Sequence, residues 1–134
     1  MTERVQEPVA ELARNLYRCL AARDLAGYFE LIADDAVFHV GGDSIVAGEY
    51  RGKAAIAALG MKLMNETAGS FQTELISVLA NGSHAVTLHR WSADRRGRHV
   101  EMRNFNVYRF ADGLLAERWE FIEDQRAHDA FWAP

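Results

Sequence analysis

Apolar residues in the first half of the chain recur at the spacing of amphipathic helices. Between about Glu7 and Ala22 they fall three and four positions apart, which places them on one face of a helix. Asp24, a residue type that often caps helix N-termini, begins a second, shorter apolar pattern. A third helical pattern starts near Gly52, and residues 36–40 between the second and third have the composition of a short strand. The first half is therefore predicted to hold three helices and one strand.

The second half changes to the period of two that is typical of strands. Strands are predicted over residues 71–79, 84–93, 99–110 and 114–122, with turn dipeptides at residues 81–82 and 112–113. The tail, 123–132, fits either a short helix or a docked extension. Helices followed by an antiparallel meander indicate an α+β fold, in which the helices pack on one face of a curved sheet.

Turn chemistry gives a trial register for the last three strands. If residues 96–97 and 112–113 form two-residue turns, His89 lies opposite Asn104, and Tyr108 lies opposite Glu117. One face then combines aromatic side chains with isolated polar groups, which is the composition of a small-molecule cavity. The members of this face are Thr87, His89, Trp91, Met102, Asn104, Asn106, Tyr108, Leu115, Glu117, Trp119 and Phe121. The opposite face is rich in charge and suits water or a subunit contact.

Composition restricts the class of protein. The chain has 134 residues, 49% of them hydrophobic, and we expect residues 1–134 to form one domain. A net charge of −4 argues against nucleic-acid binding, and no apolar run is long enough for a membrane span. Cys19 is the only cysteine, and the first residues lack the apolar core of a signal peptide, so a cytoplasmic location is expected. The five histidines lack metal-ligand spacing, and no nucleotide-binding loop occurs, so neither a metal nor a cofactor is expected.

Three segments resemble the SnoaL-like branch of the nuclear transport factor 2-like superfamily, which includes ketosteroid isomerases. They are LYRCLAARDLAGYFELIADDAVFHVGG, AGEYRGKAAIAAL and VYRFADGLLAERWEF. The resemblance implies a cone-shaped, cystatin-like fold, with a curved antiparallel sheet and three helices closing an apolar cavity. It also implies a homodimer.

When the resemblance is carried over residue by residue, other residue types stand at the positions of the isomerase's catalytic residues. The isomerase's aspartate base falls at Val40, with His39 beside it. The isomerase's helix tyrosine falls near Leu16, and its protonated aspartate falls at Asn106. The residues of a steroid isomerase are therefore missing. SnoaL-type polyketide cyclases place an acidic base on a late strand, and Glu117 is similar to that residue.

We therefore predict a cofactor-free cyclase or isomerase that removes a proton next to the carbonyl of a small apolar molecule. Glu117 is the predicted base, because burial among aromatic rings would raise its pKa toward neutrality. Asn106 and Tyr108 would donate to the enolate oxygen, and His89 would act as acid or base. The predicted substrate contacts are Asn104, Trp91, Trp119, Phe121, Met102, His39, Val40 and Leu16.

Two alternatives use the same fold. The cavity could bind a small apolar ligand without catalysis, which the missing isomerase residues favour. Alternatively, Trp91 and Trp119 could fill the cavity, and the domain would then act through its dimer partner. Each candidate also has a structural interpretation, since buried polar groups often only satisfy one another.

Overall fold

Four strands of the second half form a continuous antiparallel meander, as the alternating pattern predicts. The protein is described by a computed structural model that covers residues 2–134, with side chains from residue 8 onward. The strands are β1 (Ile32–Val40), β2 (Gly48–Arg51), β3 (Gln72–Asn81), β4 (His84–Arg95), β5 (Arg98–Ala111) and β6 (Leu114–Ile122). The helices are α1 (Thr2–Ala21), α2 (Leu25–Glu30), α3 (Gly52–Glu66) and α4 (Gln125–Phe131).

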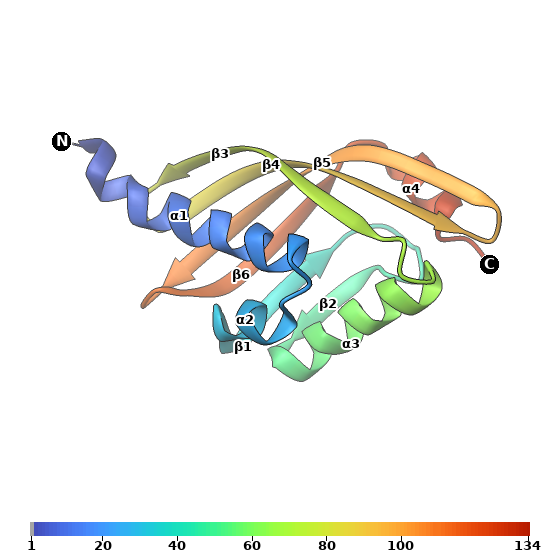
Figure 1. Ribbon diagram of the computed structural model, residues 1–134, viewed down its shortest axis with the longest axis horizontal. Helices are drawn as coiled ribbons and strands as arrows, with labels where there is room; N and C mark the ends of the chain where they lie inside the picture. Colours follow the sequence, from blue (N-terminus) through green and yellow to red (C-terminus); the bar gives the residue numbers. More distant parts are fainter. Residues whose placement is uncertain (1) are drawn as a thin grey trace.

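All six strands belong to one curved, unclosed sheet in the order β2-β1-β6-β5-β4-β3 (Figure 1). The strand β1 runs parallel to β6, and β2 pairs with β1 at the edge. The sequence pattern gave no sign of β2, because four residues directly before a helix are too few to show alternation. The predicted α+β class, with three helices in the first half, is confirmed.

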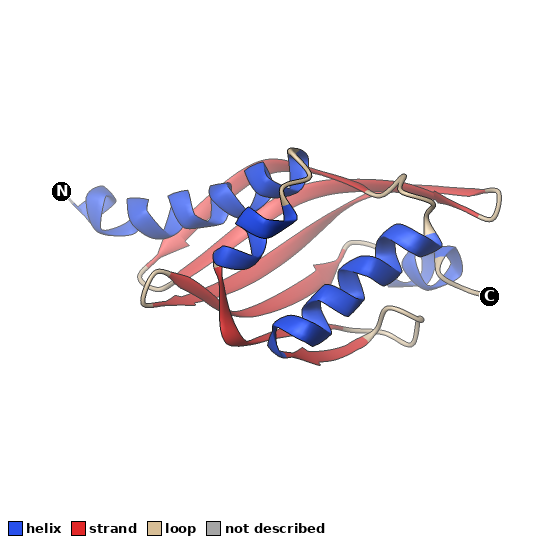
Figure 2. Cartoon of the chain, turned by 60° about the horizontal axis from the view of Figure 1, so that its bottom comes forward, coloured by secondary structure: helices blue, strands red, loops and turns tan. Residues whose placement is uncertain are grey.

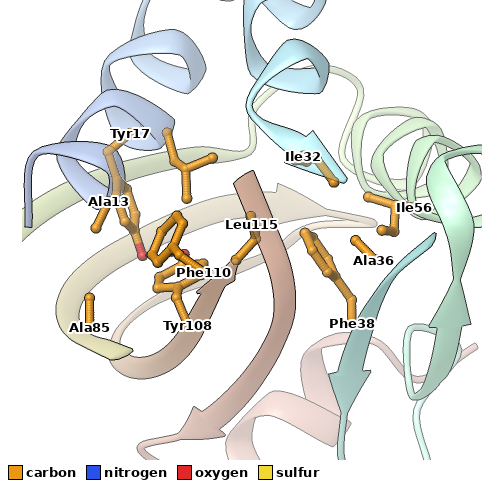
Figure 3. Close-up of a cluster of buried hydrophobic side chains, with 11 residues drawn as sticks. Ala13, Tyr17, Ile32, Ala36, Phe38, Ile56, Ala85, Tyr108, Phe110 and Leu115 are labelled. Atoms are coloured by element: carbon orange, nitrogen blue, oxygen red, sulfur yellow. Dashed lines mark hydrogen bonds between the residues drawn. The ribbon is translucent and has the colours of Figure 1, made fainter. Parts of the chain in front are cut away.

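The helices α1, α2 and α3 cover one face of the sheet, which we call the interior face (Figure 2). The helix α1 packs on β3 and β4, and α3 packs on β1 and β2. Figure 3 shows the core beneath α1 and α2, where Tyr17 and Ala13 of α1 pack near Tyr108 and Phe110 of β5. The Asp24 carboxylate accepts a hydrogen bond from Gly27 N at 2.9 Å, so the predicted helix cap is confirmed. We call the uncovered side of the sheet the outer face.

Both predicted hairpin turns are confirmed. Arg96 and Gly97 have φ angles of 51° and 77°, and Asp112 and Gly113 have angles of 53° and 78°. Two successive positive φ angles define the two-residue turn that fits the twist of antiparallel strands. For β4 and β5 the expected register follows, with His89 opposite Asn104 and Trp91 opposite Met102.

The register between β5 and β6 differs from the prediction. Phe110 lies opposite Leu115, but Arg109 lies opposite Glu117, so Ala116 is an extra residue in β6. Such a bulge shifts every later residue by one position, which exchanges the two faces of the strand. Tyr108 therefore lies opposite Arg118, and not opposite Glu117.

The C-terminal segment forms the helix α4, which closes one end of the sheet beside the β4–β5 hairpin (Figure 1). Its Phe131 and the following Trp132 are buried against Trp91 of β4. Arg95, which is 3% exposed, donates hydrogen bonds to the carbonyl oxygens of Phe131 and Ala133 at 3.2 and 2.6 Å. We call this arrangement the C-terminal latch.

None of the helices in the described part of the chain has the length and apolar character that a membrane span requires.

Candidate functional site

The hydroxyl of Tyr17 is the centre of a buried polar network on the interior face. It lies 2.8 Å from Thr87 Oγ1 and 3.1 Å from His89 Nδ1. It also accepts hydrogen bonds from Tyr108 Oη at 2.9 Å and from Asn106 Nδ2 at 3.3 Å. One helix and two strands thus meet at a single phenol oxygen. The network joins three of the predicted site residues to one that was not predicted, Tyr17.

The hydrogen-bond donors of Asn106 and Tyr108 are already used within this network. Asn106 Nδ2 donates to both Tyr17 and Tyr108, and the Tyr108 hydroxyl donates to Tyr17. Asn106 Oδ1, in contrast, is buried and has no partner in the described part of the chain. Because an unsatisfied buried acceptor is costly, this atom is a candidate partner for a ligand group or water that donates a hydrogen bond.

His89 is an uncharged ring at neutral pH. Burial, together with the positive charge of Arg118, lowers the pKa of His89 to about 4. Burial also raises the pKa of the Tyr17 and Tyr108 hydroxyls, which therefore keep their protons. The interior network thus consists of neutral groups that donate and accept hydrogen bonds.

Two charged residues of β6 share the interior face with this network. Glu120 lies opposite Asn106, and Arg118 lies opposite Tyr108, because the bulge at Ala116 turns both inward. The Arg118 guanidinium lies over the Phe38 ring, 4.2 Å from its centroid. We call Tyr17, Thr87, His89, Asn106, Tyr108, Arg118 and Glu120 the interior site.

Most other predicted contacts lie on the interior face but have structural partners. Asn104 Oδ1 accepts a hydrogen bond from the backbone N–H of Glu123 at 3.3 Å, which ties β5 to the segment after β6. Trp91, Met102 and Val40 belong to the apolar cluster around α4, and Leu16 is buried in the core under α1. Trp91 stacks on Trp132, with ring centroids 6.2 Å apart, and the indole N–H of each has no partner in the described part of the chain.

Glu117 lies on the outer face, and the prediction that it faces the cavity is wrong. Its Oε2 accepts a hydrogen bond from His39 Nε2 at 2.6 Å, and Arg109 lies 3.3 Å from its Oε1. The bond from His39 lowers the pKa of Glu117, whereas the predicted cavity position would raise it. The bulge explains the error, because it moves Glu117 out of the aromatic face.

Trp119 and Phe121 were predicted to line the cavity, and they also lie on the outer face for the same reason. Trp119 stacks on His39, with ring centroids 5.5 Å apart, and Phe121 is 54% exposed. His39 therefore points away from the interior site, whereas its neighbour Val40 points inward and is buried. Trp119 does not fill the interior.

An open depression of about 610 Å³ lies between β5 and the start of α4. Met102 is the only predicted site residue on its wall, which also carries Glu101, Glu123 and Asp124. It does not reach the Tyr17 network, and we do not assign it as the functional site. In the described part of the chain, no three His, Cys, Asp or Glu side chains are grouped so that they could hold a metal ion.

The curved sheet with three helices on its interior face is an architecture that the chain shares with solved structures. Solved structures with this architecture are described as NTF2-like and cystatin-like. The model of the SnoaL-like domain family matches residues 13–118, and the chain belongs to this family.

Two individual proteins are similar to the chain over nearly its whole length. Bal32a, from a soil-derived mobile gene cassette, is 30% identical and has a TM-score of 0.92 over 96% of this chain and 99% of Bal32a. The uncharacterized protein Rv0034 of Mycobacterium tuberculosis is 27% identical over 124 residues, which are 92% of this chain and 95% of that protein.

A protein of Jannaschia sp. CCS1, classed as a SnoaL-like polyketide cyclase, shares the fold. Its structure has a TM-score of 0.76 at 17% identity, and the match covers 97% of this chain and 95% of that one. A protein of Kribbella flavida classed as a ketosteroid isomerase also has this fold, with a TM-score of 0.70 at 18% identity over 89% of this chain and 80% of that one. The chain thus shares its fold with proteins classed as a polyketide cyclase and a ketosteroid isomerase.

Sequence reasoning missed three residues of the interior site, namely Tyr17, Arg118 and Glu120. Tyr17 is one position after Leu16, where the isomerase resemblance places a tyrosine, so that signal was present in the sequence. Arg118 and Glu120 were assigned to the wrong face, because no sequence pattern announces the extra residue at Ala116.

Proposed function

We propose that the protein is a cofactor-independent enzyme that removes a proton from the carbon next to a carbonyl group. The observation that carries this proposal is the position of Glu120, a carboxylate on the interior face opposite Asn106. A carboxylate beside neutral hydrogen-bonding groups and partly removed from water is suited to general-base catalysis. Glu120 therefore takes the role that the sequence assigned to Glu117.

In this reaction, Glu120 takes the proton and the electrons of the C–H bond move onto the carbonyl oxygen, giving an enolate. When the Tyr17 hydroxyl donates its hydrogen bond to Nδ1 of the neutral His89 ring, the ring carries its own hydrogen on Nε2 and can donate it in a hydrogen bond to the enolate oxygen. Return of the proton from Glu120 to a different carbon completes an isomerisation. Alternatively, the enolate carbon attacks a second carbonyl of the same molecule, a C–C bond forms, and the resulting alkoxide takes the proton back from Glu120, which completes a cyclisation. Neither route requires a cofactor.

The proposal is tested by exchange of α-hydrogens in D₂O, with 2-tetralone as the probe and ¹H NMR as the measurement. The wild-type protein should exchange these hydrogens faster than buffer, and Glu120→Gln should reduce the rate by at least about a hundredfold. Glu117→Gln is the matched control on the same strand, because its side chain lies on the outer face. Equal rates for wild type and Glu120→Gln, or no exchange above buffer, would reject the proposal.

We also propose that two copies of the chain associate through their outer faces. Four apolar side chains there are exposed, in two cross-strand pairs: Leu79 by 72% opposite Val86 by 36%, and Phe105 by 50% opposite Phe121 by 54%. Exposed apolar side chains gathered on one face are typical of an interaction site. A two-fold contact would place this surface against itself and leave the helices free.

A further inference from the structure

We propose that Arg118 is the specificity-determining residue of the interior site, and that the natural ligand has an apolar body carrying an anionic oxygen. The anionic group is a carboxylate or the ionised form of an acidic enol or phenol. This inference deepens the proposed function and rests on the same interior site, but it does not require Glu120 to act as a base.

The first argument is the incomplete bonding of the Arg118 guanidinium. Its Nε is buried and has no hydrogen-bond partner in the described part of the chain. In that part, no carboxylate lies within salt-bridge distance of its terminal nitrogens, although Glu120 is near enough to act on it electrostatically. Arg118 is half-buried, on a face covered by helices. A buried guanidinium with free donors is a binding group for an anion.

The second argument is a comparison with Arg95, a buried arginine on the same face of the sheet. Arg95 is 3% exposed and fully engaged, since Glu66 lies 2.8 Å from its Nη2 and backbone carbonyls accept from its Nη1. The protein therefore pairs an interior arginine with a carboxylate where the arginine's role is structural. Arg118 has only the face of the Phe38 ring, which is a weaker partner than a carboxylate.

The third argument is the charge balance around Arg118. Besides Glu120, the titratable groups that interact with Arg118 include the hydroxyls of Tyr108, Tyr28 and Tyr17, and burial keeps all three protonated by raising their pKa. His89 is neutral because its pKa is lowered to about 4. Arg118 is therefore the one positive charge of the interior site, and Glu120 is its one carboxylate. Since these two make no direct ion pair, a ligand oxygen can occupy the position that a paired carboxylate would take.

The test compares two probes of the same shape, 2-naphthoate and the neutral ketone 2-acetylnaphthalene, by isothermal titration calorimetry. The wild-type protein should bind 2-naphthoate at least tenfold more tightly than the ketone. Arg118→Gln should remove this preference and change ketone binding less than twofold, and Arg118→Lys should retain part of it. Arg109→Gln is the matched control, because Arg109 lies on the outer face beside Glu117. Circular dichroism checks that each variant is folded.

A second measurement uses the wild-type protein alone, so its result does not depend on whether an Arg118 variant folds. The absorbance of 4-nitrophenol reports its ionised fraction, and binding next to Arg118 should lower its apparent pKa by about one unit or more. An unchanged or raised pKa of the bound phenol would overturn the inference. Equal or tighter binding of the ketone, or binding of neither naphthalene probe at millimolar concentration, would do the same.

The outcomes also separate this inference from the proposed function. A preference for 2-naphthoate without α-hydrogen exchange would leave Arg118 as an anion-binding residue in a protein without the proposed catalysis. Exchange that depends on Glu120, without a preference for the anion, would reject the role of Arg118 and leave the base in place.

Discussion

At the scale of the residue, Tyr17 shows how one atom can organise a site. Its oxygen has two acceptor positions, and Tyr108 and Asn106 occupy both. The hydroxyl can therefore donate its one hydrogen bond to Thr87 or to His89, but not to both. The choice of which His89 nitrogen carries the hydrogen is thus coupled to the helix α1, from which Tyr17 comes.

The buried state of His89 predicts a pH-dependent stability. Its pKa is lowered from 6.5 to about 4 in the folded protein, so the unfolded chain takes up the proton first as the pH falls. The stabilisation from this residue is complete above about pH 6.5 and is lost between pH 6.5 and pH 4. The full effect corresponds to roughly 3 kcal/mol.

Urea denaturation at several pH values checks this expectation. The free energy of unfolding of His89→Gln should fall less steeply than that of the wild type between pH 6.5 and pH 4. His84→Gln is the matched control, because His84 is exposed on β4 and its replacement should leave the slope unchanged. A wild-type slope in His89→Gln would show that this ring does not titrate as the structure indicates.

At the scale of the element, the C-terminal latch explains why a seven-residue helix stays attached to the sheet. The helix α4 is too short to be stable by itself, so its position depends on tertiary contacts. Those contacts are the burial of Phe131 and Trp132 and the hydrogen bonds from Arg95 to the backbone that follows the helix.

Replacing Arg95 by Met should therefore release this segment. The change removes one of the two arginines that donate to the carbonyl oxygens of Phe131 and Ala133, since Arg98 is the other, and it leaves Glu66 without its partner. The protein should lose about 2–4 kcal/mol of stability. Arg96→Met is the matched control, because Arg96 lies in the exposed turn. Chemical denaturation followed by tryptophan fluorescence measures both, and equal stability of the two variants would contradict the role of the latch.

The strands show which parts of the fold and of the candidate site the sequence can predict. The period of two located β3 to β6, and the dipeptide turns set the register of β4 against β5 correctly. The face of β6 was predicted wrongly, because alternation repeats every two residues and one extra residue inverts it without changing the composition. Asn106, Tyr108 and His89 were placed on the correct face, since their strands precede the bulge.

At the scale of the whole molecule, the sheet separates two surfaces of different character. Helices and a polar network lie on the interior face, whereas exposed apolar side chains and the ion pairs of Glu117 lie on the outer face. Each side therefore suits a different partner, namely a small molecule inside and a second copy outside.

The outer-face dimer is tested by replacing Phe105 with Asp. A charge at the centre of an apolar contact has to be buried without a partner, so the variant should be monomeric in sedimentation velocity and native mass spectrometry. Leu25→Asp is the matched control, because Leu25 is similarly exposed but lies on α2, and this variant should remain dimeric. A monomeric wild-type protein, or a dimeric Phe105→Asp variant, would contradict the proposal.

The strand β6 has a consequence for how such a protein can change during evolution. Along Glu117–Phe121, neighbouring residues alternate between the outer face and the interior site. Substitutions at Arg118 and Glu120 can alter ligand chemistry while Trp119 and Phe121 keep the outer surface unchanged, and the reverse also holds. The proposed ligand site and the proposed dimer contact thus use alternate residues of one stretch of sequence. Substitutions in this stretch can change the proposed ligand without changing the proposed dimer contact.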